Sequence, residues 1–277
     1  MPIVTISRGT MSGGKALAEC VARALGCACI AREVLLEGAA KLGVSEERLR
    51  EGMERSPGLW NRFTAERRTY VLACQAALVE HAAQGDFVYH GFAGNLLLRD
   101  VPEVLRVRLI APLELRIQAL AQQRGMTREQ AERYIADVDQ DRARWSRLMY
   151  DAEIGDPRLY DLVLNLEKAS LESACDAVVA MARRREFTVD EAARARCIDF
   201  AMACRVRLAL DLHPSSRGLD LEVASRDGRV TLKGALPQAQ LASHATERWM
   251  SELRKVAEDV PGVKHVDLEL DVVRRYR

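Results

Sequence analysis

The sequence lacks several features that would assign it to a common class of protein. Lys and Arg total 41 and Asp and Glu total 40, so no excess of positive charge favours general nucleic-acid binding. No apolar run approaches the roughly 20 residues that a membrane-spanning helix needs. The N-terminus does not have the basic and then apolar layout of a signal peptide. We therefore expect a cytoplasmic protein with no transmembrane segment and no nucleic-acid partner.

The cysteines and histidines also lack the spacing of a disulfide framework or a metal site. The seven cysteines include no C-x-x-C pair, and the closest two are Cys27 and Cys29. The five histidines are scattered without ligand spacing, so no protein metal site is predicted. An odd number of cysteines without a spacing pattern favours reduced, mostly buried thiols.

What the sequence does have is a glycine-rich turn after its first apolar run. Ile3–Ile6 predicts a buried strand, and the residues that follow Lys15 predict an amphipathic helix. Between them, Gly9 and the Gly14-Lys15 pair have G-x-x-x-x-G-K spacing. Such glycines let backbone N–H groups converge on a phosphate, and the lysine reaches the outer phosphates. An ordinary strand-to-helix turn is the alternative. The predicted phosphate-binding residues are Gly9, Thr10, Met11, Ser12, Gly13, Gly14, Lys15 and Ala16.

Strands and helices alternate as far as about residue 187. The further predicted strands are 26–30, 87–90, 105–110 and 160–165, and the predicted helices include 34–42, 64–83 and 170–184, one that opens at Pro112 and one capped by Thr127. This alternation predicts an α/β fold, a parallel sheet with helices on both faces. Ligands bind such sheets at the carboxyl ends of the strands, where the glycine-rich loop, Arg32 and Gly91–Gly94 all fall.

The pattern changes after a charged, Ala-rich connector. An amphipathic helix ends near Leu212, a hairpin turns at Asp227-Gly228, a helix begins at Pro237, and a last strand carries Val266 to Val272. The expected result is a small α-β-β-α-β domain whose three-stranded sheet packs on two helices. The predicted division is a first domain at 1–187, a helical connector at 188–196 and a second domain at 197–277.

Several motifs of the first domain occur together and in order. They are Ile6-Ser7-Arg8 with Ser12-Gly13-Gly14, Arg32-Glu33, Val107–Pro112 with Arg116, Asp139-x-x-Arg142, and Asp156-Pro157-x-x-Tyr160 continuing to Asn165. With these motifs the domain resembles the cytidylate kinase-like family of P-loop nucleoside monophosphate kinases. The resemblance implies ATP and Mg²⁺ as cofactors and CMP or dCMP as the phosphoryl acceptor.

The same resemblance implies roles for individual residues. Lys15 and the loop amides would hold the donor phosphates, and Arg116 and Arg142 would close over the transferring group. Arg32 would bind the acceptor phosphate, and Gly91 and Gly94 belong to the same acceptor side. Arginines on a movable lid suit phosphoryl transfer, which needs positioned positive charge more than covalent chemistry.

The chain departs from the family's pattern at two places. Ala16 stands where a hydroxyl residue would hold Mg²⁺, and Gly91-Phe92-Ala93 replaces a Gly-Arg-Gly run whose arginine would bind the acceptor. The alternative to a kinase is therefore a catalytically weak, nucleotide-binding sensor or scaffold.

The second domain has its own recognisable motifs. Asp227-Gly228-x-Val230-x-Leu232-x-Gly234 and Val260-Pro261-Gly262-Val263-x-x-Val266 resemble those of a BON domain. These are turn positions, so they indicate a fold rather than a chemistry. The resemblance implies tethering to a protein partner or a phospholipid surface, or homo-oligomerisation. A purely lipid- or protein-binding adaptor is a third hypothesis for the whole chain.

Overall fold

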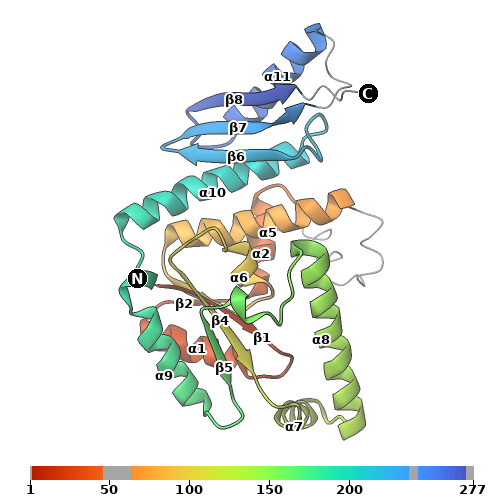
Figure 1. Cartoon of the computed structure of the whole chain (residues 1–277), viewed down its shortest axis with the longest axis vertical. Coiled ribbons are helices and arrows are strands. Elements are labelled where there is room, and N and C mark those ends of the chain that lie inside the picture. Colours follow the sequence, from red (N-terminus) through yellow and green to blue (C-terminus); the bar gives the residue numbers. More distant parts are fainter. Residues whose placement is uncertain (1, 46–63, 237–242, 273–277) are drawn as a thin grey trace.

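The first part of the chain builds a five-stranded parallel sheet. A computed structural model describes residues 2–45, 64–236 and 243–272 (Figure 1). The sheet has the order β2-β3-β1-β4-β5, and every neighbouring pair is parallel. This confirms the predicted α/β fold. The strands are β1 (Ile3–Arg8), β2 (Ala28–Ile30), β3 (Phe87–Tyr89), β4 (Val104–Ile110) and β5 (Leu162–Asn165).

Helices cover both faces of this sheet because side chains on the central strands alternate in direction. Val4 and Ile6 of β1 join a core with the helices α1 and α9, whereas Ile3 joins a second core with α2 and α5. The helices are α1 (Gly14–Leu25), α2 (Arg32–Lys41), α5 (Thr64–Gln84), α6 (Gly94–Leu97), α7 (Leu113–Arg124), α8 (Arg128–Tyr150) and α9 (Leu171–Ala182), with 3₁₀ turns at Pro157–Leu159 and Arg185–Phe187.

Two helix starts follow the signals in the sequence. Thr127 and Gln130 form the predicted capping box at the start of α8. Ser170 accepts a hydrogen bond from the Ser173 N–H at the start of α9. The capping box fixes where α8 begins, and α8 carries Arg142, one of the predicted site residues.

The last part of the chain forms a small mixed sheet with two helices, in the predicted α-β-β-α-β order. The elements are α10 (Glu191–Leu212), β6 (Leu221–Arg226), β7 (Arg229–Leu236), α11 (Ser243–Glu258) and β8 (His265–Val272). Strand β7 pairs antiparallel with β6 and parallel with β8. The predicted helix start at Pro237 lies outside the described residues.

Helix α10 joins the two parts because two of its faces are apolar. Cys197, Cys204 and Leu208 pack into the core that contains α5, whereas Val206 and Leu210 pack into the core of the small sheet. Figure 1 shows α10 lying between α5 and this sheet. One unbroken helix thus runs from the predicted connector into the predicted second domain.

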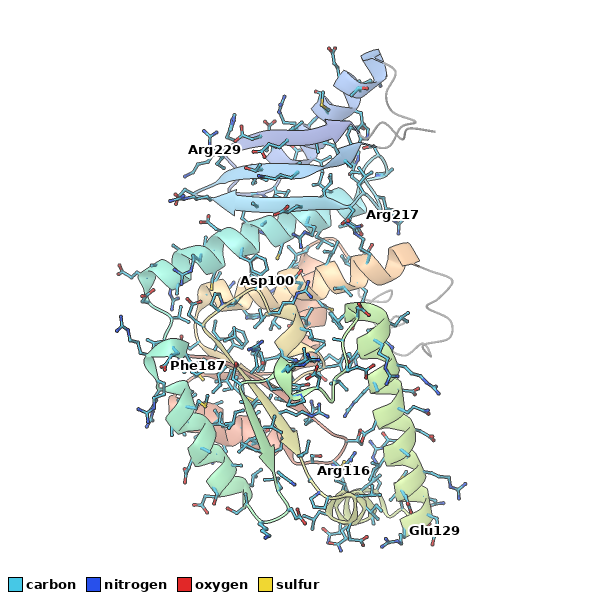
Figure 2. All side chains as sticks on the ribbon, viewed as in Figure 1. Asp100, Arg116, Glu129, Phe187, Arg217 and Arg229 are labelled. Atoms are coloured by element: carbon cyan, nitrogen blue, oxygen red, sulfur yellow. A yellow bond between two sulfur atoms is a disulfide. The ribbon has the colours of Figure 1, made fainter. Side chains whose placement is uncertain are left out.

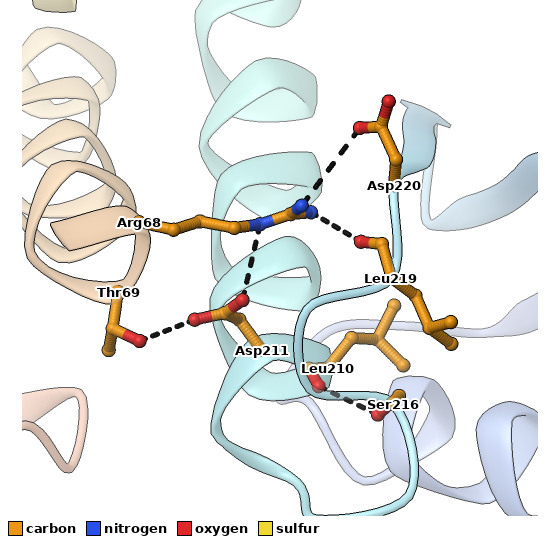
Figure 3. A network of polar contacts seen from close by, with 7 residues as sticks. All are labelled: Arg68, Thr69, Leu210, Asp211, Ser216, Leu219 and Asp220. Carbon is orange, nitrogen blue, oxygen red and sulfur yellow. Dashed lines mark hydrogen bonds and ion pairs between the residues drawn. The ribbon is translucent and has the colours of Figure 1, made fainter. Parts of the chain in front are cut away.

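A buried carboxylate reinforces the contact between α5 and α10 (Figure 3). Asp211, only 3% exposed, accepts a hydrogen bond from the Thr69 hydroxyl, and its other oxygen lies 3.2 Å from Arg68 Nε. Arg68 also donates to the Leu219 carbonyl, just before β6. Charge and hydrogen bonds therefore bind the C-terminal part to α5.

The prediction of reduced thiols is wrong for two cysteines. Cys20 on α1 and Cys175 on α9 form a disulfide, although 155 residues separate them. The two helices pack side by side on one face of the sheet, and local cysteine spacing carries no information about such a contact. Cys27, Cys29, Cys74, Cys197 and Cys204 are free thiols.

Among the residues described, no helix is both long enough and apolar enough to cross a membrane.

Candidate active site

The loop between β1 and α1 has the backbone shape of an anion-binding turn. Met11 and Gly13 both have positive φ, 62° and 80°, on either side of Ser12. Such an alternation turns successive N–H groups toward one concave side. The first N–H groups of α1 also have no carbonyl one turn earlier in the helix to accept from them. The loop can therefore bind a phosphate through its backbone.

The arginines predicted on the lid converge on Thr10 of this loop. Arg142 Nη1 donates to the Thr10 hydroxyl at 3.0 Å, and Arg116 Nε donates to the Thr10 carbonyl at 2.6 Å. Asp139 accepts from the Thr10 N–H at 3.0 Å and is paired with Arg116. Arg116 belongs to α7, and Figure 2 labels it beside that helix. The structure thus brings α7 and α8 directly onto the predicted phosphate loop.

The charges in this cluster affect one another. Burial favours a higher pKa for Asp139, but hydrogen bonds from Thr10 and Arg116 outweigh it and hold that pKa below its ordinary value. Burial lowers the pKa of Arg142, and the neighbouring positive charge of Arg8 adds to that effect. Arg142 and Arg8 are therefore close enough to repel each other in a partly dry environment.

Arg8 is a site residue that the sequence-based assignment of roles left out. It ends β1, and its Nη1 donates to the His90 carbonyl, just after β3, at 3.0 Å. A Cβ at Gly14 would lie 2.0 Å from Arg8 Cδ, so the arginine stem passes through the space that this glycine leaves. The Ser-Arg motif ahead of the glycines was the available signal, because it places a cation at the carboxyl end of β1.

Lys15 does not join the arginines. Its side chain is 74% exposed, and its ammonium lies 3.7 Å from Glu19 one turn along α1. Its predicted contact with the donor phosphates stays a prediction. Ala16 follows it on α1 and offers no hydroxyl.

On the predicted acceptor side, Arg32 begins α2 and lines a small pocket. The cavity volume is about 10 Å³, room for one water molecule. The other lining residues are Leu35, Tyr70, Cys74, Tyr89, Phe92, Leu97 and Tyr150. Burial raises the pKa of Cys74 to about 11 and raises the pKa values of the three tyrosines, so thiol and phenols stay neutral. Arg32 is the one charged group among these lining residues.

Gly91 and Gly94 make room for one of these tyrosines. A Cβ at Gly91 would lie 1.8 Å from the Tyr89 hydroxyl oxygen, and a Cβ at Gly94 would lie 2.3 Å from Tyr89 Cδ1. Phe92 between them packs edge-on against Trp145 of α8, with 6.0 Å between ring centroids. The pair of glycines therefore shapes the wall of the pocket around Tyr89.

A model of the cytidylate kinase-like family matches residues 3–168, more than half of the chain. The chain belongs to the cytidylate kinase-like family. A cytidylate kinase of Pyrobaculum aerophilum is 26% identical over 175 residues, which cover 63% of this chain and 89% of that protein. A cytidylate kinase of Pyrococcus horikoshii is 32% identical over 95 residues, 34% of this chain and 48% of that protein.

The fold is also found in a solved structure. An uncharacterized protein from Eubacterium ventriosum superposes with a TM-score of 0.53 at 17% identity, over 67% of this chain and all of that chain. At this identity the likeness concerns the fold alone. The family match ends at residue 168, so the resemblance of the C-terminal part to a BON domain stays a prediction.

Membership of a kinase family implies Mg²⁺. The described residues do not supply a set of ligands that would bind this ion to the protein. Among them, no three His, Cys, Asp or Glu side chains gather as a metal site. Asp139 is already engaged by Arg116 and Thr10, and Ala16 has no oxygen to offer. Ser12 keeps a buried hydroxyl without a hydrogen-bond partner in the described structure, but one hydroxyl is not a ligand set for Mg²⁺.

Proposed function

We propose that this chain is an ATP-dependent nucleoside monophosphate kinase, with CMP or dCMP as the first acceptors to test. The observation that carries the proposal is the convergence of Arg116, Arg142 and Arg8 on a loop with anion-binding backbone geometry. The family membership and the two similar cytidylate kinases support the same reaction. Mg²⁺ would enter with the phosphates of ATP rather than on a protein carboxylate.

The reaction moves one phosphoryl group between two phosphates. An oxygen of the acceptor's phosphate forms a bond to the γ-phosphorus of ATP. The bond from that phosphorus to the bridging oxygen breaks, and its electron pair leaves on ADP. Charge spreads over the γ-phosphoryl oxygens in the transition state, and guanidinium groups held around it lower the barrier.

The residues of the loop and lid divide this work. Backbone N–H groups at the start of α1 bind the donor phosphates. When ATP binds, the guanidinium groups of Arg116 and Arg142 exchange their hydrogen bonds to Thr10 for hydrogen bonds to the γ-phosphoryl oxygens. The hydrogen bonds they now make to the loop keep α7 and α8 close to it, so little movement is needed.

The acceptor pocket needs a larger change. Arg32 is placed to bind the acceptor's phosphate, but a cavity of about 10 Å³ does not admit a nucleobase. Binding therefore requires Phe92 or a tyrosine of the wall to move. Phe92 in place of an arginine leaves fewer charges for the acceptor, which predicts a high KM for CMP.

The second candidate function is a nucleotide-binding sensor. It is favoured by the absence of a Mg²⁺ ligand set among the described residues and by the extensive packing of α10 against α5. Such a protein would bind ATP without turning it over and report the bound state through its C-terminal part.

A matched pair of arginines on α8 separates these functions. Arg142 contacts the loop, whereas Arg144 is exposed and lies 3.7 Å from Asp141 on its own helix. We expect Arg142→Gln to lower the rate of phosphoryl transfer, measured as ADP release over a panel of nucleoside monophosphates, by at least about 100-fold. Arg144→Gln should leave it unchanged. A wild-type protein that binds ATP but releases no ADP with any acceptor would establish the sensor instead.

For the C-terminal part, numbered 197–277 in the predicted division, we propose a BON-like tethering role toward a protein partner. The solvent face of its sheet is covered by cross-strand ion pairs, Arg229 with Asp267 at 3.0 Å and Lys233 with Glu269 at 2.8 Å. A charge-balanced face has little attraction for an anionic phospholipid surface. Sedimentation of the full chain with phosphatidylserine vesicles would contradict this assignment.

A further inference from the structure

The positive charge at the phosphate loop comes from arginines and not from Lys15. Arg116 and Arg142 contact Thr10, and the stem of Arg8 passes directly beside Gly14. Lys15 stands in solvent with Glu19. The side chain of Lys15, the cation expected from the loop motif, is therefore not at the loop. The side chain of Arg8, from the preceding strand, lies there instead.

Arg8 lies between the donor side and the acceptor side of the site. Its stem is against the loop at Gly14, and its guanidinium is bound to the His90 carbonyl after β3, where the acceptor wall begins. Strands β1 and β3 are direct neighbours in the sheet. Arg8 is also near enough to Tyr89 in that wall to oppose the rise of its pKa that burial causes. A phosphoryl group passing from the loop to the pocket would pass this guanidinium.

The cluster also has more positive than negative charge. In the described part of the chain, Arg8, Arg116 and Arg142 make hydrogen bonds to two carbonyls, one hydroxyl and one carboxylate, Asp139. Burial lowers the pKa of Arg8, and Tyr89 and then the exposed Glu33 at the start of α2 oppose this effect without cancelling it. Partly buried cations without equal counter-charge are stabilised by an anion. A phosphoryl group supplies that charge.

We propose that Arg8 binds the transferring phosphoryl group and takes the part assigned to Lys15 from the loop motif. The proposal rests on the proposed kinase function. A guanidinium has five N–H donors, and one of those of Arg8 is used by His90, so a planar edge remains for two phosphoryl oxygens. The bond to His90 fixes the guanidinium before ATP arrives, which is the preorganisation that transition-state stabilisation needs.

The first test compares two nucleotides that differ by the γ-phosphate. We expect Arg8→Gln to weaken binding of the non-hydrolysable ATP analogue AMP-PNP by at least about 10-fold, with ADP affinity changed less than about 3-fold, by titration calorimetry. Equal losses for both nucleotides, or none for either, would overturn the assignment. This readout does not require turnover, so it stands even if no acceptor is phosphorylated and the kinase proposal fails.

The second test ranks the two cations in turnover. Arg8→Gln should lower kcat by about 10³-fold, as the loss of an arginine from a phosphoryl-transfer site does, and Lys15→Ala should lower it at least 10-fold less. The opposite ranking would return the role to Lys15. If Arg8→Gln lowers the melting temperature, the variant Arg8→Lys replaces it in both tests. Lysine keeps the positive charge but cannot bind two oxygens at once. Its affinity for AMP-PNP should therefore still fall more than its affinity for ADP.

Discussion

Gly14 and the side chain of Arg8 lie directly against each other at the start of α1. The arginine explains why residue 14 has no side chain, and the glycine explains how the arginine reaches the loop. A helix interior normally prefers alanine to glycine by up to about 1 kcal/mol. Gly14 is kept small because Arg8 Cδ lies 2.0 Å from where its Cβ would be. Gly14 thus lets the side chain of Arg8, at the end of β1, reach the glycine-rich loop.

Replacing this glycine should therefore displace the arginine. We expect Gly14→Ala to destabilise the protein by about 1–2 kcal/mol, since overpacking outweighs the helix preference, and to weaken AMP-PNP binding. Gly85→Ala is the matched control, because nothing lies within 4 Å of its added Cβ. Chemical unfolding and calorimetry measure both effects. A Gly14→Ala protein with unchanged affinity would mean that Arg8 does not bind the phosphate.

The carboxylate of Asp139 makes the contact of α7 and α8 with the glycine-rich loop dependent on pH. Its pKa in the folded protein lies below the ordinary 3.8, so its stabilising effect is present above that value and lost as the pH falls through the lowered pKa. Unfolding by urea between about pH 5 and about pH 2.5 should show a steeper loss for the wild type than for Asp139→Asn. Asp141→Asn, exposed on the same helix, should behave as the wild type. Identical slopes for all three proteins would mean that Asp139 does not cause the loss of stability in acid.

At the scale of elements, α10 joins the large sheet and its helices to the small C-terminal sheet. Its two apolar faces pack into different cores, and its Asp211 bonds to α5. Arg68 and Thr69, which hold that carboxylate, come directly before Tyr70 on α5, which lines the small pocket beside Arg32. The C-terminal part is therefore attached one turn from the pocket.

The two carboxylates beside Arg68 should differ greatly in their effect on stability. Asp211→Ala leaves Arg68 and Thr69 without their buried partner, and we expect a loss of about 2–3 kcal/mol, reduced from the fully buried case because Arg68 is part-exposed. Asp220→Ala removes a fully exposed carboxylate 4.0 Å from the same guanidinium and should leave the stability nearly unchanged. Unfolding in guanidinium chloride measures the difference. Equal effects would contradict the buried network.

The disulfide between α1 and α9 closes a loop across the whole first sheet. Because 155 residues separate Cys20 from Cys175, the bond restricts the unfolded chain strongly. We expect Cys20→Ser to lower the free energy of unfolding by about 2–4 kcal/mol and Cys27→Ser to leave it nearly unchanged. A mass measurement without reductant would show two hydrogens fewer than the sequence if the bond is formed. An unmodified mass would contradict it.

Over the whole molecule, features read from local pattern were predicted correctly. Apolar periodicity gave the strands and helices, their alternation gave the parallel sheet, and the hairpin at Asp227-Gly228 gave the small second sheet. The glycine-rich loop, Arg116 and Arg142 were singled out because each sits in a short motif, and their roles stay predictions. These predictions needed only neighbouring residues.

Features that depend on contacts between distant segments were not predictable. Cys20 on α1 bonds to Cys175 on α9, and Arg8 lies against the loop because Gly14 leaves it space and the His90 carbonyl accepts its hydrogen bond. The aromatic wall combines residues of α5, β3 and α8, none of which has a motif of its own. Lys15 shows the reverse case, because its motif predicts a phosphate contact while its side chain is exposed to solvent beside Glu19.

The central claim is that the arginine-lined loop transfers a phosphoryl group. The most direct measurement is phosphorus NMR of ATP mixed with CMP and the full chain, which identifies the products themselves. We predict that the wild type forms CDP and ADP in equal amounts and that Arg142→Gln forms both at least about 100-fold more slowly. ATP that remains intact with the wild type, over a panel that also includes dCMP, AMP, GMP and UMP, would contradict the claim.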